Sequence, residues 1–460
     1  TFVGYKAKVV NVQPGATVTV QLDQDAEMLK DVVVIGMGTQ KKENLSAAVA
    51  TVDVGKAVDS RPVPDIGRAL QGTTPGLNVT IANGELGSDP KFRIRGQISS
   101  INSASDPLIL VDNVPIPTIT LLNPDDVESI SILKDAASAS IYGTKAANGV
   151  IQTKNGSEKP VGSVSVTYQG SVAFRKPTQM PKLGAIEAYQ YFYDYTLERR
   201  SMTTGGLDQA NSLTGFYWYM TLDDLERAKW WQNEYGGMNT LEPMVYGRDW
   251  ETRAPRDYSE RNIAYRTYDV YESIYKDSAP TIKQNISISG NTGNTTYNIG
   301  LGYTNQIGFL DVSKDNFAVY NISISLTTKV NKFFTARASM RYSKTEKEYP
   351  NNQDGTSYDA LWYALRWSQY YPQGATWYGY NTRDARSEME QSGIMTDTKQ
   401  NLTANIGGTL NILKGWSADI DVTYVSDNRF LYYPGYWRSY IDTWSAATVP
   451  ITDENGLAIF

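Results

Sequence analysis

The 460-residue sequence contains no histidine and no cysteine. These absences exclude a cysteine nucleophile, a disulfide, a Cys/His zinc site, a Ser-His-Asp triad and an imidazole acid or base. A formal net charge of −6 argues against a nucleic-acid partner, which would require a basic face. We assign no residue to catalysis or to a metal site, and we expect no resident cofactor.

Long apolar runs are also missing, because no stretch approaches the ~18 consecutive apolar residues of a membrane-spanning helix. The chain does have 12% aromatic residues, including 32 Tyr, together with a mean hydropathy of −0.41. A chain that is both this aromatic and this polar is typically rich in β-strands that have one hydrated face.

The sequence predicts four regions. Residues 1–26 have the pattern of the end of a small β domain, and residues 27–45 hold a short extended segment and a linker. Residues 46–158 mix short apolar strands with two short helices, one around Ala69 and one from Ala136 to Tyr142, which predicts a compact α+β domain. Residues 159–460 form the fourth region, and their pattern is different.

Apolar residues alternate with small polar residues along this fourth region, which is the pattern of half-buried β-strands. Val164 and Val166, for example, alternate with Ser163, Ser165 and Thr167. We expect about seven strands of roughly ten residues each. The apolar positions of the other six strands fall within residues 282–288, 297–303, 320–326, 336–342, 402–410 and 416–424.

The connections between these strands distinguish two all-β architectures. Short turns at residues 291–294, 329–332 and 412–415 alternate with long connections at 175–280, 306–315, 346–398 and from 429 onward. This order is typical of a transmembrane barrel, which has brief turns on one side and large loops on the other, and a soluble β-sandwich with long loops is the alternative. Tyrosines recur near the expected strand ends, as in an aromatic girdle: Tyr168, Tyr303, Tyr320, Tyr342 and Tyr424.

A globular domain directly before a barrel suggests a plug. Barrels of about 22 strands have a lumen too wide for side chains to fill, and such transporters carry a plug. The predicted fold class is therefore a transmembrane antiparallel β-barrel of about 22 strands preceded by an α+β plug domain, of which this chain holds about the first third of the strands.

Several segments, in order, resemble SusC/RagA-like TonB-dependent transporters of Bacteroidota. The closest match is Ile132-Leu133-Lys134-Asp135-Ala136 followed by Ala146-Ala147-Asn148-Gly149-Val150-Ile151. The other matching segments are Phe2 to Lys6, similar to the end of a carboxypeptidase-regulatory-like domain, Leu29 to Gln40, Leu70 to Val79, Phe92 to Gly96 and Pro107 to Asp112. The resemblance extends over essentially the whole chain.

The resemblance implies active import of a large nutrient across the outer membrane of a Gram-negative bacterium. Its implied partners are TonB with ExbB and ExbD, a SusD-like surface lipoprotein acting as a lid, and membrane lipid, in a dimer of SusC–SusD pairs. The cargo in this family is most often an oligosaccharide, with peptides as the alternative. The implied TonB box is Asp31, Val32, Val33, Val34 and Ile35. A buried strand of the preceding domain is the other interpretation of these valines.

Three further groups of residues are candidates for function. Arg93 and Arg95 flank Ile94 and share one face of a strand, so they could latch the plug to acidic residues of the wall or be ordinary surface charges. Asp125 and Asp126 are interpreted as turn residues rather than a metal site, because the spacing places no third ligand. Aromatic residues of the long loops are candidates for contact with cargo or lid: Trp218, Trp230, Trp231, Trp362, Trp367 and Trp377.

Two other classes of protein remain possible from the residues alone. A secreted glycan-binding protein or glycoside hydrolase would be aromatic and β-rich, and a hydrolase would use paired carboxylates, but no pair stands out by its spacing. A passive porin or adhesin would share the barrel but would not need energy from a periplasmic partner. Uptake through a porin would therefore survive the loss of TonB.

Overall fold

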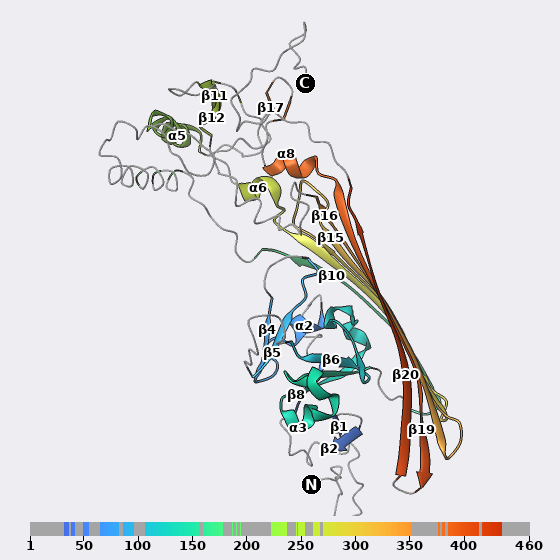
Figure 1. Cartoon of the computed structure of the whole chain (residues 1–460). Coiled ribbons are helices and arrows are strands. Elements are labelled where there is room, and N and C mark those ends of the chain that lie inside the picture. Colours follow the sequence, from blue (N-terminus) through green and yellow to red (C-terminus); the bar gives the residue numbers. More distant parts are fainter. Residues whose placement is uncertain are drawn as a thin grey trace, which may run out of the picture.

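A computed structural model describes the following parts of the chain: residues 32–35, 38–41, 49–54, 65–81, 86–95, 106–155, 160–177, 186, 190, 194, 222–236, 245, 247–253, 261–266, 270–351, 376–377, 380–381, 385–413 and 416–434. Residues 1–26, for which a small β domain is expected, lie outside them. The structure has two main parts, a mixed α+β domain and a long antiparallel sheet, and the domain lies against one face of the sheet (Figure 1).

The α+β domain, called here the plug domain, is built around a five-stranded mixed sheet in the order β3-β8-β9-β6-β7, with β4 and β5 forming a separate hairpin. Strand β6 runs parallel to β9, whereas β8 is antiparallel to both of its neighbours. Its elements are β3 (Val49–Asp53), α2 (Ile66–Ala69), β4 (Leu77–Thr80), β5 (Lys91–Ile94), β6 (Leu108–Val111), β7 (Val114–Pro115), η3 (Ile119–Leu121), η4 (Pro124–Asp126), β8 (Val127–Leu133), α3 (Ala136–Ala139), η5 (Ser140–Ala146) and β9 (Val150–Asn155).

The plug domain has a continuous apolar core. Ile130 and Ile132 of β8 and Ile151 of β9 are fully buried, because alternate residues of a strand point to the same face. The second predicted helix is shorter than expected. Asp135 caps α3 by accepting a hydrogen bond from the backbone N–H of Ser138, and the helix then tightens into η5, where Gly143 has a φ of 64° that no continuous helix allows.

The long sheet, called here the wall, contains seven antiparallel strands joined in sequence order, so the predicted number of strands is confirmed. The sheet does not close on itself within the described residues, and β10 and β20 are its edges. Each strand pairs with the next in an unshifted register except for one irregularity between Asn411 and Leu413. Its strands are β10 (Ser163–Arg175), β13 (Ala279–Asn291), β14 (Thr295–Ile307), β15 (Asn316–Lys329), β16 (Phe334–Pro350), β19 (Ile394–Leu413) and β20 (Trp416–Tyr432).

The two faces of the wall differ in chemistry as the alternation predicts. Ser323 and Ser343 point from β15 and β16 toward the plug domain, where each contacts it. Residues of the opposite parity are apolar and exposed, as Val166 on β10 and Ile420 on β20 show with 69% and 71% exposure. The wall therefore has a polar inner face and an apolar outer face, which is the arrangement of a lipid-facing barrel strand.

The outer face has a cross-strand pair of tyrosines toward one end of the wall and a single tyrosine toward the other end. Tyr303 and Tyr320 are direct cross-strand partners with ring centroids 5.1 Å apart, and Lys344 lies over the Tyr320 ring. Six residues further down the same strand is Tyr297, about 20 Å away at the ~3.3 Å rise of a strand. This separation approaches the ~25 Å apolar band of an outer-membrane barrel. Tyr168 and Tyr424 lie nearer the middle of their strands than the girdle prediction requires.

Three wall strands are longer than the sequence pattern indicates. β16 runs to Pro350 and β19 begins at Ile394, although the connection between them was expected to span residues 346–398. The outer face at the end of β16 is polar, because Lys344, the cross-strand partner of Tyr320, is followed on that face by Glu346, with which it forms an ion pair, and by Glu348. Since the alternation of apolar and polar residues stops where the lipid-facing band stops, the pattern cannot mark the true ends. β20 extends past residue 429 to Tyr432, and there Phe430, Leu431 and Tyr432 follow one another without intervening polar residues, so no alternation marks the strand end.

The long connections gather at one end of the wall, and the amino-terminal hairpin lies toward the other end (Figure 1). Contacts tie three of the connections together: the Lys276 N–H donates to the Phe309 carbonyl, and Arg386 donates to the Ser273 carbonyl. The described helices are all too short or too polar to span a membrane. The elements in these connections are α5 (Leu222–Tyr235), β11 (Trp250–Arg253), β12 (Arg261–Ala264), α6 (Val270–Ile274), β17 (Thr376–Trp377), β18 (Tyr380–Asn381) and α8 (Ala385–Glu390).

Candidate functional site

The plug domain is attached to the inner face of the wall through one of its segments, residues 111–126. Arg341 on β16 donates a hydrogen bond of 2.7 Å to the carboxylate of Asp112, which lies in the turn between β6 and β7, and another of 3.4 Å to the Val111 carbonyl. The guanidinium and the carboxylate also form an ion pair. The Arg341 side chain is only 11% exposed, so solvent screens this pair less than a surface pair.

Two wall serines complete the polar contacts. The Ser343 hydroxyl on β16 donates to the backbone carbonyl of Leu121, at the end of η3, over 2.8 Å. The Ser323 hydroxyl on β15 donates over 2.8 Å to the carboxylate of Asp126, the last residue of η4. Because Asp126 directly precedes β8, this contact holds the beginning of the strand at the centre of the plug domain.

Two glycines of β14 allow the plug segment to approach the wall closely. A Cβ at Gly300 would overlap the carboxylate of Asp126, and a Cβ at Gly302 would lie 3.0 Å from the side-chain nitrogen of Asn123. Both positions face inward and have no side chain at the points where η4 approaches the wall. We call Gly300, Gly302, Ser323, Arg341 and Ser343 the seat.

An apolar contact supports the plug domain closer to the long connections. Leu86 of the plug domain forms a small buried cluster with Phe317 and Val319 of β15. Gly87 has a φ of 68°, and any Cβ there would overlap the Phe317 ring. The plug domain is thus held by polar contacts at the seat and by an apolar contact at the end of β15.

The two predicted latch residues take no part in the seat contacts described above. Arg93 in β5 and Arg95 just after it are both exposed, whereas Phe92 and Ile94, each directly before one of them, are buried, as the alternation indicates. Neither arginine forms an ion pair with the wall in the described part of the chain. The ion pair that joins plug domain and wall has the opposite polarity, with the acid on the plug (Asp112) and the base on the wall. The latch role of Arg93 and Arg95 stays a prediction.

Sequence reasoning missed the seat. The interpretation of Asp126 as a turn residue agrees with its place in η4, but it does not include the contact of its carboxylate with the wall. Asp112 and Arg341 are separated by 229 positions in the sequence, so no local pattern links them. The available signal was the pair Gly300 and Gly302 at inward positions of a strand, since glycine inside a strand often marks a close approach of another backbone.

The predicted TonB box forms one strand of a hairpin. β1 (Val32–Ile35) pairs antiparallel with β2 (Gly38–Lys41), from Val32 opposite Lys41 to Ile35 opposite Gly38. The sheet has only these two strands, so β1 is paired along one edge within the described residues. Asp31 lies outside those residues. The assignment of Asp31–Ile35 as a TonB box stays a prediction.

The loop tryptophans fall into three groups. Trp231 on α5 is 2% exposed and packs with Tyr265 in the interior of the loop, so it is not available for cargo. Trp230, the next residue, is 53% exposed and lies edge-on to Tyr235 with centroids 5.9 Å apart. Trp377 is described only as backbone, in β17. The predicted residues Trp218, Trp362 and Trp367 lie outside the described residues.

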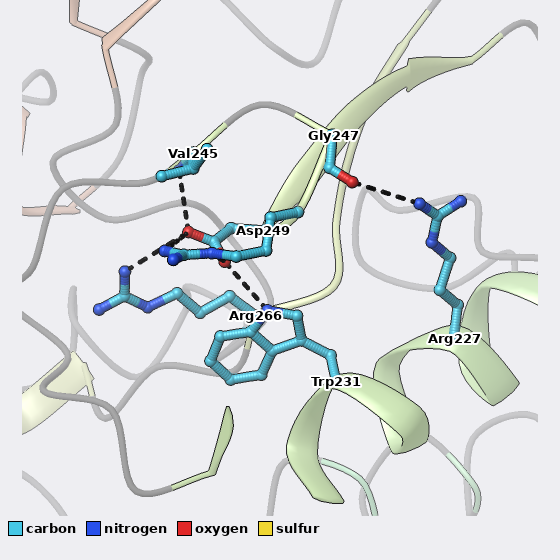
Figure 2. Close-up of polar contacts among 7 residues, drawn as sticks. Arg227, Trp231, Val245, Gly247, Asp249 and Arg266 are labelled. Carbon is cyan, nitrogen blue, oxygen red and sulfur yellow. Dashed lines mark hydrogen bonds and ion pairs between the residues drawn. The ribbon is translucent and has the colours of Figure 1, made fainter. Parts of the chain in front are cut away.

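Buried charges organise this loop around Asp249 (Figure 2). The Asp249 carboxylate accepts hydrogen bonds from the Trp231 indole at 3.0 Å, from the Val245 backbone N–H at 2.8 Å, and twice from Arg248 at 2.7 Å. Arg266, which is 1% exposed, lies 3.9 Å away. Burial by itself would raise the pKa of Asp249, but the hydrogen bonds from Arg248, Val245 and Trp231 and the charge of Arg248 outweigh it and lower the pKa below 3.8.

The contacts described at the seat are those of a binding site between two parts of the chain. Nowhere in the described ranges do three or more acidic residues gather in a way that could hold a metal ion. The seat contains hydrogen-bond donors, a guanidinium and open glycine backbone, all of which the plug segment occupies. This arrangement holds the plug domain on the wall.

Substituting Gly300 with valine should dislodge η4 from the wall. The valine side chain would occupy the place of the Asp126 carboxylate, and its β-branched shape leaves the strand itself intact. Hydrogen exchange of residues 119–126 should become faster, whereas insertion of the wall into membranes should not change. The matched control is Leu301→Val, whose side chain is 44% exposed on the outer face. Unchanged exchange in Gly300→Val would contradict the role of the glycine.

Substituting Asp249 with asparagine should destabilise the loop by on the order of 3 kcal/mol, because it removes the negative charge beside the buried Arg266 guanidinium and the partly exposed Arg248 guanidinium. In the unmodified protein the folded-state pKa is below 3.8, so this contribution to stability is complete above that pH and is lost only as the pH falls through the lowered pKa. Hydrogen exchange of Tyr265 and Arg266, whose N–H groups bond the Asp249 carbonyl, measures both effects. A loss of stability between neutral pH and 3.8 that asparagine abolishes would contradict this sign.

The sequence of the plug domain matches a known family. A family model described as the TonB-dependent Receptor Plug Domain matches residues 41–150. The chain is 39% identical over 175 residues to TonB-dependent receptor P39 of Formosa agariphila, which covers 38% of this chain and 17% of that protein. It is 27% identical over 338 residues to TonB-dependent receptor SusC of Bacteroides thetaiotaomicron, which covers 71% of this chain and 27% of that protein. The chain thus spans less than a third of either relative.

The fold matches a solved transporter. The RagAB peptide importer in its open-open state has a TM-score of 0.57 and 23% identity, over 86% of this chain and 43% of that chain. At this identity the similarity shows the fold alone, a plug domain with strands of a TonB-dependent barrel. Residues 41–150 thus form a TonB-dependent receptor plug domain, and the chain is similar to the SusC/RagA-like TonB-dependent receptors.

Proposed function

We propose that the protein imports a large nutrient across the outer membrane of a Gram-negative bacterium of the Bacteroidota, with energy supplied through TonB. The observation that carries this proposal is the plug domain seated on the polar inner face of a wall whose outer face is apolar. A domain in this position blocks the passage beside the wall until it moves. Movement requires energy from outside the protein, because the outer membrane has no ATP.

The amino-terminal hairpin suits the coupling to TonB, assisted by ExbB and ExbD. It lies toward the end of the wall opposite the long connections, which is the periplasmic side in the proposed orientation (Figure 1). β1 is a short β-branched strand paired along one edge, and a partner protein can add a strand to such an edge through backbone hydrogen bonds. A pull on Asp31–Ile35 reaches the plug domain through the chain that leads into β3.

The long connections suit the capture of cargo. They gather at one end of the wall, where contacts between α6, α8 and the β14–β15 connection hold them together. A SusD-like surface lipoprotein is the proposed lid over this end, in a dimer of such pairs. An oligosaccharide is the proposed cargo, because flat aromatic faces such as exposed Trp230 stack on sugar rings. The proposed mechanism needs neither a metal nor a cofactor.

Import of peptides is the second candidate. The fold similarity to a structure described as a peptide importer favours it, although the identity of 23% does not carry a substrate from one protein to the other. Growth of a deletion strain on a panel of glycans and peptides should distinguish the two. We expect loss of growth on an oligosaccharide and normal growth on peptides. The reverse result would assign the protein to peptide import.

Deleting Asp31–Ile35 should abolish active uptake without affecting insertion of the barrel. The deletion removes the strand that TonB would pair with, and the plug domain and wall contain none of the deleted residues. Uptake of a labelled nutrient by whole cells measures the effect, and surface labelling with outer-membrane fractionation serves as the control. Undiminished uptake in this variant, or in a strain without TonB, would favour a passive porin over the proposed transporter.

A further inference from the structure

Helix α5, in the connection at residues 175–280, has a buried face and an exposed face of different chemistry. Leu225, Ala228 and Trp231 recur every three residues and are buried in the interior of the loop. Figure 2 shows Trp231 pointing from this face toward Asp249. On the other face Trp230 is 53% exposed, and it is the only exposed apolar side chain among the residues of α5 that the structure describes. The exposed residues described around it are all polar: Asp223, Glu226, Asn233 and Glu234.

Contacts within the loop hold the Trp230 ring in place. Its plane is nearly perpendicular to that of Tyr235, with an interplanar angle of 86° and 5.9 Å between the ring centroids. Tyr235 in turn packs on Trp231 and lies under the Arg248 guanidinium. Because Trp231 and Arg248 both donate hydrogen bonds to the Asp249 carboxylate, the exposed indole is supported by the buried core of the loop. A ring that is positioned before binding loses little conformational freedom when a ligand stacks on it.

The two bases of α5 are engaged inside the loop, so its exposed face is rich in hydrogen-bond acceptors. Arg227 forms an ion pair with Glu251 of β11. Lys229 donates hydrogen bonds to the side chains of Gln190, over 2.8 Å, and Glu226, over 2.9 Å. The Glu226 side chain nevertheless stays 61% exposed, and an ionised carboxylate has acceptor sites for several donors.

Glu226 and Glu234 lie one helical turn before and one turn after Trp230. Residues four apart are neighbours on a helix surface, about 6 Å apart along the axis at a rise of ~1.5 Å per residue. A carboxylate therefore stands on either side of the indole. A sugar ring stacks its C–H face on an aromatic ring, and its hydroxyl groups donate hydrogen bonds to acceptors beside that ring. Binding sites for small molecules commonly combine an aromatic surface with a few placed polar groups in this way.

Other occupants fit this face less well. A helix that docks on a partner protein presents apolar anchors at i, i+3 or i+4 and i+7. The corresponding positions around Trp230 are Glu226, Asn233 and Glu234, all of them polar. An anionic glycan would bring its own carboxylates or sulfates close to Glu226 and Glu234, and like charges in contact oppose binding. A neutral sugar chain matches both the ring and the acceptors.

We propose that the exposed face of α5 is a subsite for a neutral oligosaccharide: Trp230 stacks on one sugar ring, and Glu226 and Glu234 accept hydrogen bonds from hydroxyl groups on either side. The inference rests on the proposed import of an oligosaccharide, and it adds where part of the cargo binds and which charge the cargo has. Because α5 lies among the long connections, the subsite acts in capture from outside rather than in passage along the wall (Figure 1).

Two substitutions of Trp230 in the full-length transporter test the stacking. Trp230→Phe keeps a flat ring, whereas Trp230→Leu keeps an apolar side chain without one. The probes are neutral hexasaccharides built from glucose, mannose or xylose, and the readout is the initial rate of uptake by whole cells. For the hexasaccharide that the parent protein imports, Trp230→Leu should raise the KM about tenfold and Trp230→Phe should raise it less, because stacking needs a planar ring. The maximal rate should not change, since capture precedes movement of the plug domain.

Val245→Ala is the matched control for these variants. Val245 is a 48% exposed apolar residue of the same loop that lies outside α5, so its KM should equal that of the parent. Surface labelling shows whether each variant reaches the membrane in equal amount. Unchanged hydrogen exchange at Tyr265 and Arg266, whose N–H groups bond the Asp249 carbonyl, shows that the core of the loop is intact.

Replacing both Glu226 and Glu234 with glutamine tests the charge of the subsite. Glutamine keeps a hydrogen-bond acceptor but removes the negative charge. Calorimetry on the purified full-length transporter compares a neutral hexasaccharide with a hexamer of galacturonic acid. The parent should bind the neutral chain more tightly, and the double variant should reduce this preference several-fold by binding the acidic chain better. Glu272→Gln, the same exchange at an exposed position of α6, should keep the preference of the parent.

Three results would overturn the proposal. The first is an unchanged KM in Trp230→Leu. The second is a parent protein that binds the galacturonic acid hexamer, or peptides, but none of the neutral hexasaccharides. The third is a Trp230→Leu variant that binds the hexasaccharide normally but loses a surface lipoprotein from the purified complex, which would assign this face of α5 to a protein contact. Uptake by the parent that does not depend on TonB would instead contradict the proposed function, and the binding measurements, which need no TonB, distinguish that case.

Discussion

Side chains in a β-strand point alternately to opposite faces, and this period of two is the constraint on which the rest of the structure depends. It lets one strand present Ile322 and Ile324 to the outside while Ser323 between them contacts the plug domain. The seven strands repeat this division in continuous register. The wall is therefore a single layer of strands with one polar and one apolar face. Both the exposed apolar face and the binding of the plug domain follow from it.

The seat shows how a binding site can be made by leaving side chains out. Gly300 and Gly302 are ordinary strand positions by pairing, yet their missing side chains open the space into which η4 fits. The polar groups around that space then orient the plug segment through directed hydrogen bonds. The Arg341 guanidinium donates to Asp112, the Ser323 hydroxyl to Asp126 and the Ser343 hydroxyl to a backbone carbonyl. The contacts at the seat are thus hydrogen bonds between polar groups, and the apolar contact between plug domain and wall is the separate one of Leu86 with Phe317 and Val319.

The sequence was sufficient for the elements with a strong local period. The seven wall strands, their short turns and the two-faced chemistry followed from alternation, and the plug family followed from a series of short motifs. The ends of β16, β19 and β20 could not be predicted, because the alternation stops where the lipid-facing band ends. The Asp112–Arg341 pair and the burial of Trp231 could not be predicted either, since both depend on which distant segments meet. Trp230 and Trp231 are adjacent and chemically identical, and only the packing of α5 on Tyr265 distinguishes the buried one from the exposed one.

The continuous register of the wall limits how such a protein can change over evolutionary time. Inserting one residue within β14 or β15 would exchange the inner and outer faces beyond the insertion, placing serine toward lipid and isoleucine toward the plug domain. Changes of length inside the strands are therefore restricted to pairs of residues or to bulges. The connections carry no such restriction, because they lie beyond the paired region and tolerate insertions. New cargo specificity can consequently arise in the loops while the membrane-facing scaffold and its seat remain as they are.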